Sequence, residues 1–480
     1  METGLHYPLD IEAMPPHWNV GYVGDFAEEI QPGFASGKYN KEGAGVPHIR
    51  PFNIDRQGRL DLAEIKSVAP DADAKRLHSG DVLFNNTNSP ELVGKTAAIT
   101  SAGDWAFSNH MTRVRFKADV LPLFGAYQLH FLWMTGYYLH NCVKHVNQAS
   151  VSSKTLARAV PFIAPPIDEQ KHIVAEFEKQ FSRLDEAVAN LNRVKANLKR
   201  YRAAVLKAAV EGHLVETEAE LARRERRGYE PGEQLLRRIT ENRHVRRNGK
   251  VSHQGHGLED NRDELPTGWT WASVGQLGDV GTGATPLKSK REYYEGGTIP
   301  WVTSGALNEE FVDSADEHIT ELALRDTNAK LFPSHTLLVA MYGEGKTRGK
   351  VSELLIRAAT NQACAAIVMD DASAHVRKFL KLYLLKNYDD VRRLSSGGVQ
   401  PNLNLSHIRD TAVPLPPLAE QKRITVDVDR RFSFVRRLET ELHTRLLIIG
   451  RLRESILRTM FSGRMRPCRS SATGVASDYA

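Results

Sequence analysis

The chain has 480 residues, of which 41% are hydrophobic and 25% are charged, a balance typical of folded globular proteins and too apolar for general disorder. Its length exceeds what one hydrophobic core usually fills, so we expect two or more domains. The net charge of +6 is compatible with a polyanionic partner but does not identify one. Three widely spaced cysteines predict neither disulfides nor a thiolate zinc site. Since the sequence shows no secretion signal and no bilayer-length apolar run, we expect no membrane insertion and a cytoplasmic location.

An internal repeat decides the predicted organisation of the chain. Met14–Trp18 recurs 251 residues later as Leu265–Trp269, and Pro165–Lys171 recurs at the same offset as Pro416–Lys422. The sequences between these ends match much less well. A shared frame around divergent contents is what two homologous domains need if each presents a different recognition surface.

Each repeat begins with a globular part, at residues 14–165 and 265–416. Short apolar runs alternate there with Gly, Pro and Asn, which predicts a mixed α/β or α+β module. The tryptophan that opens each module is expected to pack in the fold rather than to stack on bases. The expected strands are 81–84, 336–340 and 365–368, and the expected helices are 124–144 and 373–392.

A long amphipathic helix follows the Pro-Pro pair that ends each globular part. Apolar residues recur about every 3.6 residues from Ile173 to Val205 and again from Ile424 to Met460, close to the 3.5-residue period of a coiled coil. We expect the two helices to pack antiparallel as a coiled coil, which would relate the modules by a pseudo-two-fold axis. Packing of each helix on its own module is the alternative.

The segment between the repeats is predicted to be a polar linker. From Glu216 to Asp263 it holds 11 Lys+Arg and 10 Asp+Glu, a mixed charge typical of solvated chain. His253 and His256 lack acidic or cysteine partners at a metal-binding spacing and are assigned to this linker. The predicted domains are 1–165, 166–213, 214–263, 264–416, 417–465 and a disordered tail at 466–480.

The search for catalytic motifs gives one near match. Gly343–Val351 resembles a phosphate-binding loop, but its glycines are one residue too far apart, and Val351 stands where a magnesium-binding hydroxyl is needed. We expect a basic turn facing DNA phosphates, or a structural turn, instead. Neither Pro-Pro pair has the polar residue and the aromatic ring of an amino-methyltransferase motif.

Polar loop residues are the candidates for DNA contact. Asn and Thr side chains after the strand at 81–84 can pair with adenine edges or phosphates, although a self-satisfied turn is an equal alternative. Cations in a Gly/Thr/Pro loop and in the basic turn would contact phosphates. Polar residues beside Gly397 and Gly398 can reach base edges or cap local backbone. The candidates are Asn85, Asn86, Thr87, Asn88, Ser89, Lys95, Lys288, Lys290, Arg291, Lys346, Arg348, Lys350, Gln400 and Asn402.

The repeated Pro-Pro-helix motifs, together with Gly80–Ser89, Ile299–Val302 and Gly398–Asn402, resemble the specificity (S) subunit of type I restriction-modification systems. The resemblance implies two tandem homologous target recognition domains, each reading one half of a bipartite site in double-stranded DNA. Two long conserved helices would separate them and set the distance. It also implies a non-catalytic chain without a cofactor of its own. Such a chain recruits two methyltransferase (M) subunits, which use S-adenosylmethionine, and restriction (R) subunits, which use ATP and Mg.

Two other classes of protein stay open at this point. A catalytic fused restriction-methylation enzyme would need the methyltransferase motifs that the sequence lacks. A coiled-coil scaffold without DNA binding would be indifferent to DNA sequence.

Overall fold

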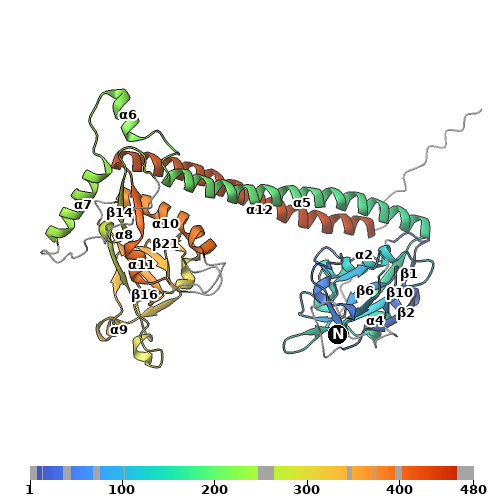
Figure 1. Cartoon of the computed structure of the whole chain (residues 1–480). Coiled ribbons are helices and arrows are strands. Elements are labelled where there is room, and N and C mark those ends of the chain that lie inside the picture. Colours follow the sequence, from blue (N-terminus) through green and yellow to red (C-terminus); the bar gives the residue numbers. More distant parts are fainter. Residues whose placement is uncertain are drawn as a thin grey trace, which may run out of the picture. The chain divides into compact units, whose positions relative to one another are not determined.

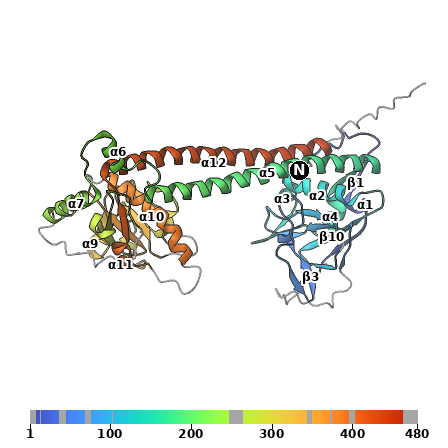
Figure 2. The ribbon, with the colours of Figure 1, turned by 45° about the horizontal axis from the view of Figure 1, so that its top comes forward.

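The computed structural model places the chain in two compact units (Figures 1 and 2). Unit 1 comprises residues 1–193 and 442–480, and unit 2 comprises residues 194–441. Unit 1 holds the first globular part, residues 14–165, called module 1 below, and unit 2 holds the second, residues 265–416, called module 2. Each unit also contains parts of both long helices. The residues that the structure describes are 8–12, 14–35, 45–68, 76–101, 103–246, 264–342, 349–370, 374–394 and 403–461.

Module 1 contains two four-stranded sheets. The main sheet is antiparallel, in the order β2 (Ala27–Pro32), β10 (Met111–Phe116), β6 (Val82–Asn85), β8 (Thr96–Ala98). The second sheet has a parallel central pair, in the order β4 (Lys66–Val68), β3 (Val46–Ile49), β9 (Trp105–Phe107), β5 (Arg76–Leu77). Strand β6 is buried throughout, and its first three residues form the apolar run that the sequence shows.

Module 2 repeats both sheets. Its main sheet follows the order β15 (Asp279–Thr282), β23 (Cys364–Val368), β20 (Leu337–Ala340), β21 (Val351–Leu354), with β17 (Phe311–Val312) as an additional edge strand. Its second sheet again has a parallel central pair, in the order β18 (Glu317–Ile319), β16 (Ile299–Val302), β22 (Ala358–Thr360), β19 (Leu331–Phe332). The duplication inferred from the motifs is therefore confirmed at the level of strand order and direction.

The constant offset of the repeat is visible in individual backbone contacts. In module 1, β1 (Asn19–Tyr22) pairs with β13 (Pro161–Ala164), and in module 2, β14 (Thr270–Ser273) pairs with β24 (Ala412–Leu415), in the same register. The short helices α1 (Val23–Phe26) and α8 (Val274–Leu277) follow. The first amide of α1 donates to Val160, and that of α8 donates to Thr411, both over 3.0 Å.

The repeated tryptophans tie the start of each module to the start of its helix. Trp18 Nε1 donates to Glu169 over 3.0 Å, and Trp269 Nε1 donates to Glu420 over 2.9 Å. Both indoles are buried, at 7% and 8% exposed, so neither ring is free to stack on a base. The prediction that they pack is confirmed.

The predicted strands and one predicted helix are confirmed by β6, β20, β23 and α10 (Ala374–Leu394). The prediction of one helix over 124–144 is wrong. Helix α2 (Pro122–Met134) ends before Gly136, whose φ of +77° cannot continue a right-handed helix. A short helix, α3 (Tyr137–His140), and a strand, β11 (Val143–Lys144), follow it.

The two long helices are α5 (Ile167–Val210) and α12 (Leu418–Phe461), of 44 residues each. In unit 1, the beginning of α5 meets the end of α12, where the Phe177 and Phe461 rings lie 5.5 Å apart. In unit 2, the end of α5 meets the beginning of α12, where the Arg202 guanidinium lies 4.7 Å from the Phe432 ring centroid. The helices are therefore antiparallel in each unit, as predicted.

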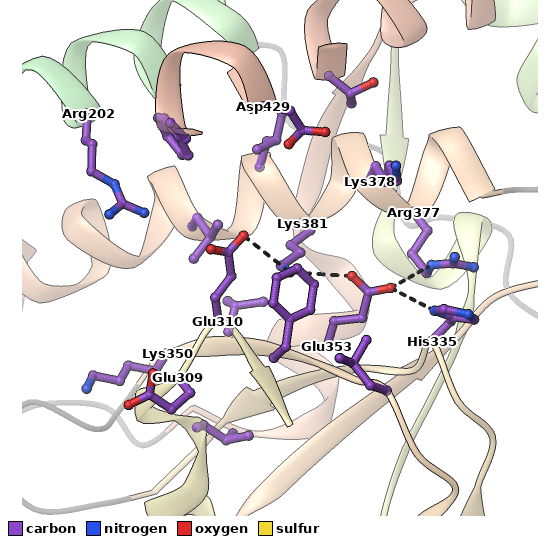
Figure 3. A pocket seen from close by; sticks show the side chains of 18 of the residues that line it. Arg202, Glu309, Glu310, His335, Lys350, Glu353, Arg377, Lys378, Lys381 and Asp429 are labelled. Carbon is purple, nitrogen blue, oxygen red and sulfur yellow. Dashed lines mark hydrogen bonds and ion pairs between the residues drawn. The ribbon is translucent and has the colours of Figure 1, made fainter. Parts of the chain in front are cut away.

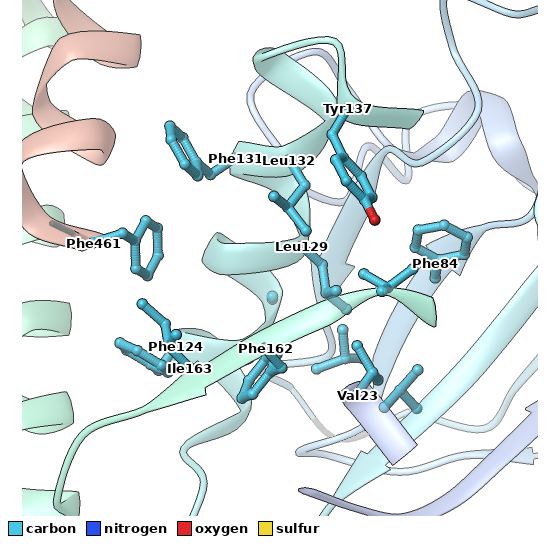
Figure 4. Packing of buried hydrophobic residues seen from close by; sticks show 14 of the residues in the cluster. Val23, Phe84, Phe124, Leu129, Phe131, Leu132, Tyr137, Phe162, Ile163 and Phe461 are labelled. Atoms are coloured by element: carbon cyan, nitrogen blue, oxygen red, sulfur yellow. The ribbon is translucent and has the colours of Figure 1, made fainter. Parts of the chain in front are cut away.

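The core of module 1 continues into the helices (Figure 4). Phe124 and Phe131 of α2 and Phe162 of β13 are fully buried together with Phe461, the last residue of α12. The ring of Phe461 lies 5.5 Å from those of both Phe124 and Phe131. Burial of each such side chain contributes about 1.5–3 kcal/mol, so the end of α12 is part of the folded module and not only a spacer.

The connector carries more structure than its composition predicts. Within 214–246, the described part of the predicted polar linker, the chain forms α6 (Glu218–Glu225) and α7 (Gly232–Arg246). Leu235 and Ile239 of α7 are buried in the module 2 core. The solvated-linker prediction is therefore corrected for this part, because its charges pair locally and with module 2. His253, His256 and the predicted tail lie outside the described residues.

Candidate nucleic-acid interface

The polar run that follows β6 in module 1 is partly interior. Asn85 is fully buried and its amide donates to the Leu92 carbonyl over 2.9 Å. The buried Asn86 amide donates to Thr112 Oγ1 over 2.8 Å and to the Asn109 carbonyl over 3.2 Å. Both side chains are buried and hydrogen-bonded inside the module, although Asn85 Oδ1 has no partner among the described residues, and we do not propose them as base contacts.

The next three residues of this run reach the surface. Thr87 Oγ1 donates to Asn86 Oδ1, and the Ser89 amide donates to Asn88 Oδ1, each over 2.8 Å. Thr87 and Asn88 form the short strand β7 and are half-buried. Their unused polar atoms stay candidates for DNA contact.

Lys95 and Lys350 follow Gly94 and Gly349 at an offset of 255 residues, close to that of the repeat, but they lie in different environments. Lys95 is 5% exposed and donates to the carbonyls of Pro51 and Ile54, and burial lowers the pKa of its ammonium group. A phosphate cannot reach it without opening the module. Lys350 is half-buried and its ammonium donates to Asn308, at the rim of a cavity described below.

The predicted cationic loop of module 2 is on the surface, around the 3-10 helix η3 (Arg291–Tyr293). Lys288 Nζ lies 4.8 Å from the Tyr294 ring centroid and 5.0 Å from that of Trp301, and it pairs with Glu317. The hydrogen bond to Glu317 raises the pKa of Lys288, so it stays charged. The Arg291 side chain is 85% exposed, with Glu295 at 3.8 Å. Lys290 lies 4.9 Å from the Tyr293 ring centroid.

Four predicted candidates have no described position. They are Lys346, Arg348, Gln400 and Asn402.

A cluster of charges that the sequence did not reveal lines a cavity of about 670 Å³ in unit 2, called junction cavity 2 (Figure 3). It lies where α10 and β17 of module 2 meet the long helices. Glu353 is at its centre, with Lys381 Nζ at 3.4 Å, Arg377 Nε at 3.5 Å and His335 Nδ1 at 3.1 Å. Desolvation lowers the pKa of Lys381, while Glu353 and Glu310 oppose that shift.

Unit 1 has a cavity of about 410 Å³ at the same place in the repeat, called junction cavity 1. Its Phe181 and Arg453 correspond, at the offset of the repeat, to Phe432 and Arg202 of junction cavity 2. Both pairs keep a cation-ring contact, at 5.7 Å in unit 1 and 4.7 Å in unit 2. Where junction cavity 2 has Lys381, junction cavity 1 has His130, beside a tryptophan ring. The position is repeated, but a buried lysine in an ion-pair cluster is replaced by a histidine beside a tryptophan, while Arg56, Glu91 and Arg453 keep charge in junction cavity 1.

A second feature missed by the sequence analysis is a small sheet in the order β11, β12 (Ala149–Ser150), β7 (Thr87–Asn88). It places the surface residues of the Asn/Thr run beside the hairpin 143–150. The sequence could have indicated the importance of this hairpin, because Gln148 and Ser150 align with the predicted candidates Gln400 and Asn402 within one residue of the repeat offset. The helix predicted over 124–144 hid this correspondence.

Comparisons with known proteins, by sequence and by structure, both lead to type I restriction-modification systems. Residues 266–445 match the family model of the type I restriction modification DNA specificity domain. The chain is 26% identical to the Escherichia coli type I restriction enzyme EcoR124I/EcoR124II specificity subunit, over 33% of this chain and 40% of that protein. It is 20% identical to the EcoKI specificity subunit of E. coli K12, over 88% of this chain and 82% of that protein.

Coverage of the first relatives is partial, because the alignments span 37% to 46% of the length of three of them. A solved structure described as the "structural basis underlying complex assembly and conformational transition of the type I R-M system" aligns over 94% of this chain and 99% of that one. Its sequence identity is 18% and its TM-score is 0.62, which shows a shared fold. In the part of the chain that the structure describes, no helix is both long and apolar enough to cross a bilayer. The resemblance that the repeated motifs indicate is thus confirmed: residues 266–445 match the type I restriction modification DNA specificity domain, and the similar proteins are type I specificity subunits.

Proposed function

We propose that this chain is the DNA-reading subunit of a type I restriction-modification complex, and that each module reads one half of a bipartite target. The observation that best supports this proposal is the duplicated fold. Strand order repeats, and the backbone contacts of the frame repeat at a fixed offset, while the loops and junction cavities differ. Two copies of one scaffold with unlike surfaces suit a target whose two halves are unlike.

The long helices are proposed to set the spacing between the half-sites. At 1.5 Å per residue, a helix of 44 residues spans about 66 Å. Half-sites on one face of a duplex repeat about every 34–36 Å, so rods of this length can set such a separation.

Catalysis is proposed to belong to partner subunits. Two M subunits would use S-adenosylmethionine to methylate adenine, and R subunits would use ATP and Mg to move and cut DNA. The present chain would bind double-stranded DNA in the cytoplasm and hold no cofactor itself.

A methylation assay separates this proposal from its rivals. The full chain, labelled S-adenosylmethionine and DNA should give no product alone, and adenine methylation in a bipartite motif once the M subunits of its system are added. Methylation by the chain alone would identify a fused enzyme. Binding by the M complex that ignores DNA sequence would identify a scaffold.

The spacing role has its own test. Removal of one heptad from each helix, residues 191–197 and 442–448, keeps the apolar phase and shortens the pair by about 10 Å, or about three base pairs. We expect a methylated motif whose half-sites move closer together, or a complex that no longer assembles. An assembled complex with an unchanged motif contradicts the spacing role.

A further inference from the structure

We propose that the β-hairpin 143–150 of module 1 enters the DNA major groove and reads an A·T pair there. The inference rests on the proposed function and names the reading element of that module. A two-stranded ribbon fits a major groove about 12 Å wide.

Exposure is the first reason. Residues 143–148 are all exposed, and Val146 at the tip is 97% exposed, with Val143 at 61%. β-branched apolar side chains in strands normally pack against a neighbour. A valine presented to water at the end of a ribbon fits the methyl group of a thymine, which offers an apolar surface in the major groove.

The chemistry of the tip is the second reason. Asn147 and Gln148 follow Val146, and side-chain amides pair with the N6 and N7 edge of adenine through two hydrogen bonds. Neither residue has a side-chain hydrogen bond in the part of the chain that the structure describes, whereas the neighbouring His145 ring is within 3.2 Å of Ser150 Oγ. The amides are therefore available to a ligand.

Charge is the third reason. The stretch from Val120 to Ile167 contains no Asp or Glu, whereas Lys144, Lys154 and Arg158 lie within it. A polyanion can approach this surface without meeting a carboxylate from the hairpin or its flanks. An acidic or neutral protein partner would not require the amides at the tip.

Rigidity is the fourth reason. The turn is closed by the His145 amide, which donates to the Gln148 carbonyl over 2.7 Å, and β12 pairs with β7. At its base, the Val151 amide donates to the Asn86 carbonyl over 2.9 Å, and the Asn86 side chain is anchored on Thr112. Asn86, expected to touch DNA, is thus a positioning residue for the hairpin.

The test compares the full complex with M subunits carrying wild-type chain or the double variant Asn147→Ala, Gln148→Ala. We expect affinity for the cognate site to fall about 5- to 150-fold, with relaxed preference at one A·T pair of one half-site only. Asn192→Ala, an exposed amide on α5, and Val20→Ala, an exposed valine in β1, are matched controls that should leave both quantities unchanged. Lys144→Ala should make the negative slope of log affinity against log salt less steep by about 0.9, if Lys144 contacts one phosphate.

Two failures are distinguishable. If the wild-type complex has no sequence preference, the proposed function is wrong and the inference fails with it. If the wild-type complex is specific and the double variant keeps its motif and affinity, or loses M-subunit assembly instead of base discrimination, only the hairpin inference is wrong.

Discussion

Both modules are tied to the long helices by an ion pair, Arg59–Asp185 in unit 1 and Glu310–Arg436 in unit 2, but the buried groups packed beside these pairs differ chemically. In unit 1, Phe461 of α12 packs among aromatic rings of module 1 and of α5. In unit 2, Arg436 of α12 pairs with Glu310 over 3.2 Å, beside the buried Glu353 cluster. A duplicated backbone frame therefore fixes where a junction forms but not what holds it. The two junctions should fail under different perturbations.

The largest effect is expected at the aromatic junction. Phe461→Ala removes a fully buried ring and should lower the free energy of unfolding of unit 1 by about 3–5 kcal/mol. Denaturant titration followed by hydrogen exchange of α2 measures it. Phe434→Ala, on the same helix and 50% exposed, is the matched control. Equal effects of the two variants would show that the ring at 461 does not hold the junction.

Disruption of the charged junction should lower the free energy of unfolding of unit 2 slightly less. Glu353→Gln leaves Arg377 buried with an uncharged partner and Lys381 with Glu310 as its remaining carboxylate. Breaking a buried pair costs about 3–5 kcal/mol, and the amide oxygen and Glu310 offset part of that. Hydrogen exchange of α10 measures the loss. Glu317→Gln, which breaks the exposed pair with Lys288, should cost at most about 1 kcal/mol. Indistinguishable costs would contradict an ionic junction.

Acid should act on unit 1 through junction cavity 1. Burial lowers the pKa of His130 from 6.5 to about 4, so the unfolded chain binds its proton first as pH falls. Unfolding free energy should therefore decrease from pH 6.5 down to pH 4, by at most about 3 kcal/mol from this residue. His48, whose pKa is also lowered to about 4 by burial, adds a loss of the same sign.

The pH slope of unfolding, measured between pH 4 and 6.5, checks this origin. His130→Gln should reduce the slope without abolishing it, because His48 is retained. His172→Gln, an exposed histidine on α5, should leave it as in the wild type. An unchanged slope in His130→Gln would remove junction cavity 1 as its source.

The smallest loss of stability is expected at Gly212, where the first long helix ends and the chain contacts the start of the second repeat. Gly212 has φ +76°, and an added Cβ would lie 2.5 Å from the Pro266 ring. Gly212→Ala should therefore cost about 1–3 kcal/mol in thermal unfolding. Gly228→Ala, where a Cβ meets nothing within 4 Å, is the matched control and should be near neutral. A neutral Gly212→Ala would mean that this turn can relax.

The frame could be predicted from sequence because its signals are local and occur twice. The Pro-Pro pair breaks the preceding strand, and the following Gln reports a helix start: Gln170 and Gln421 each donate back to the first proline of the pair, over 2.8 and 2.7 Å. Apolar periodicity then gives the helix and its buried face.

The site could not be predicted as fully, because burial of polar groups depends on partners far along the chain. Lys95 finds the carbonyls of Pro51 and Ile54, and the connector residue Glu218 finds Arg423 at the start of the second long helix. A loop sequence does not show whether its amides face a neighbour or a ligand. The same lysine position is buried in module 1 and lies at a cavity rim in module 2.

An exchange of module 1 tests the central claim most directly. Residues 14–165 would be replaced by the corresponding module of another specificity subunit, and modified adenines would be mapped by sequencing DNA methylated by the complex. We predict that one half of the methylated motif changes while the other half is retained. Changes in both halves, or in neither, would contradict independent reading by two copies of one fold.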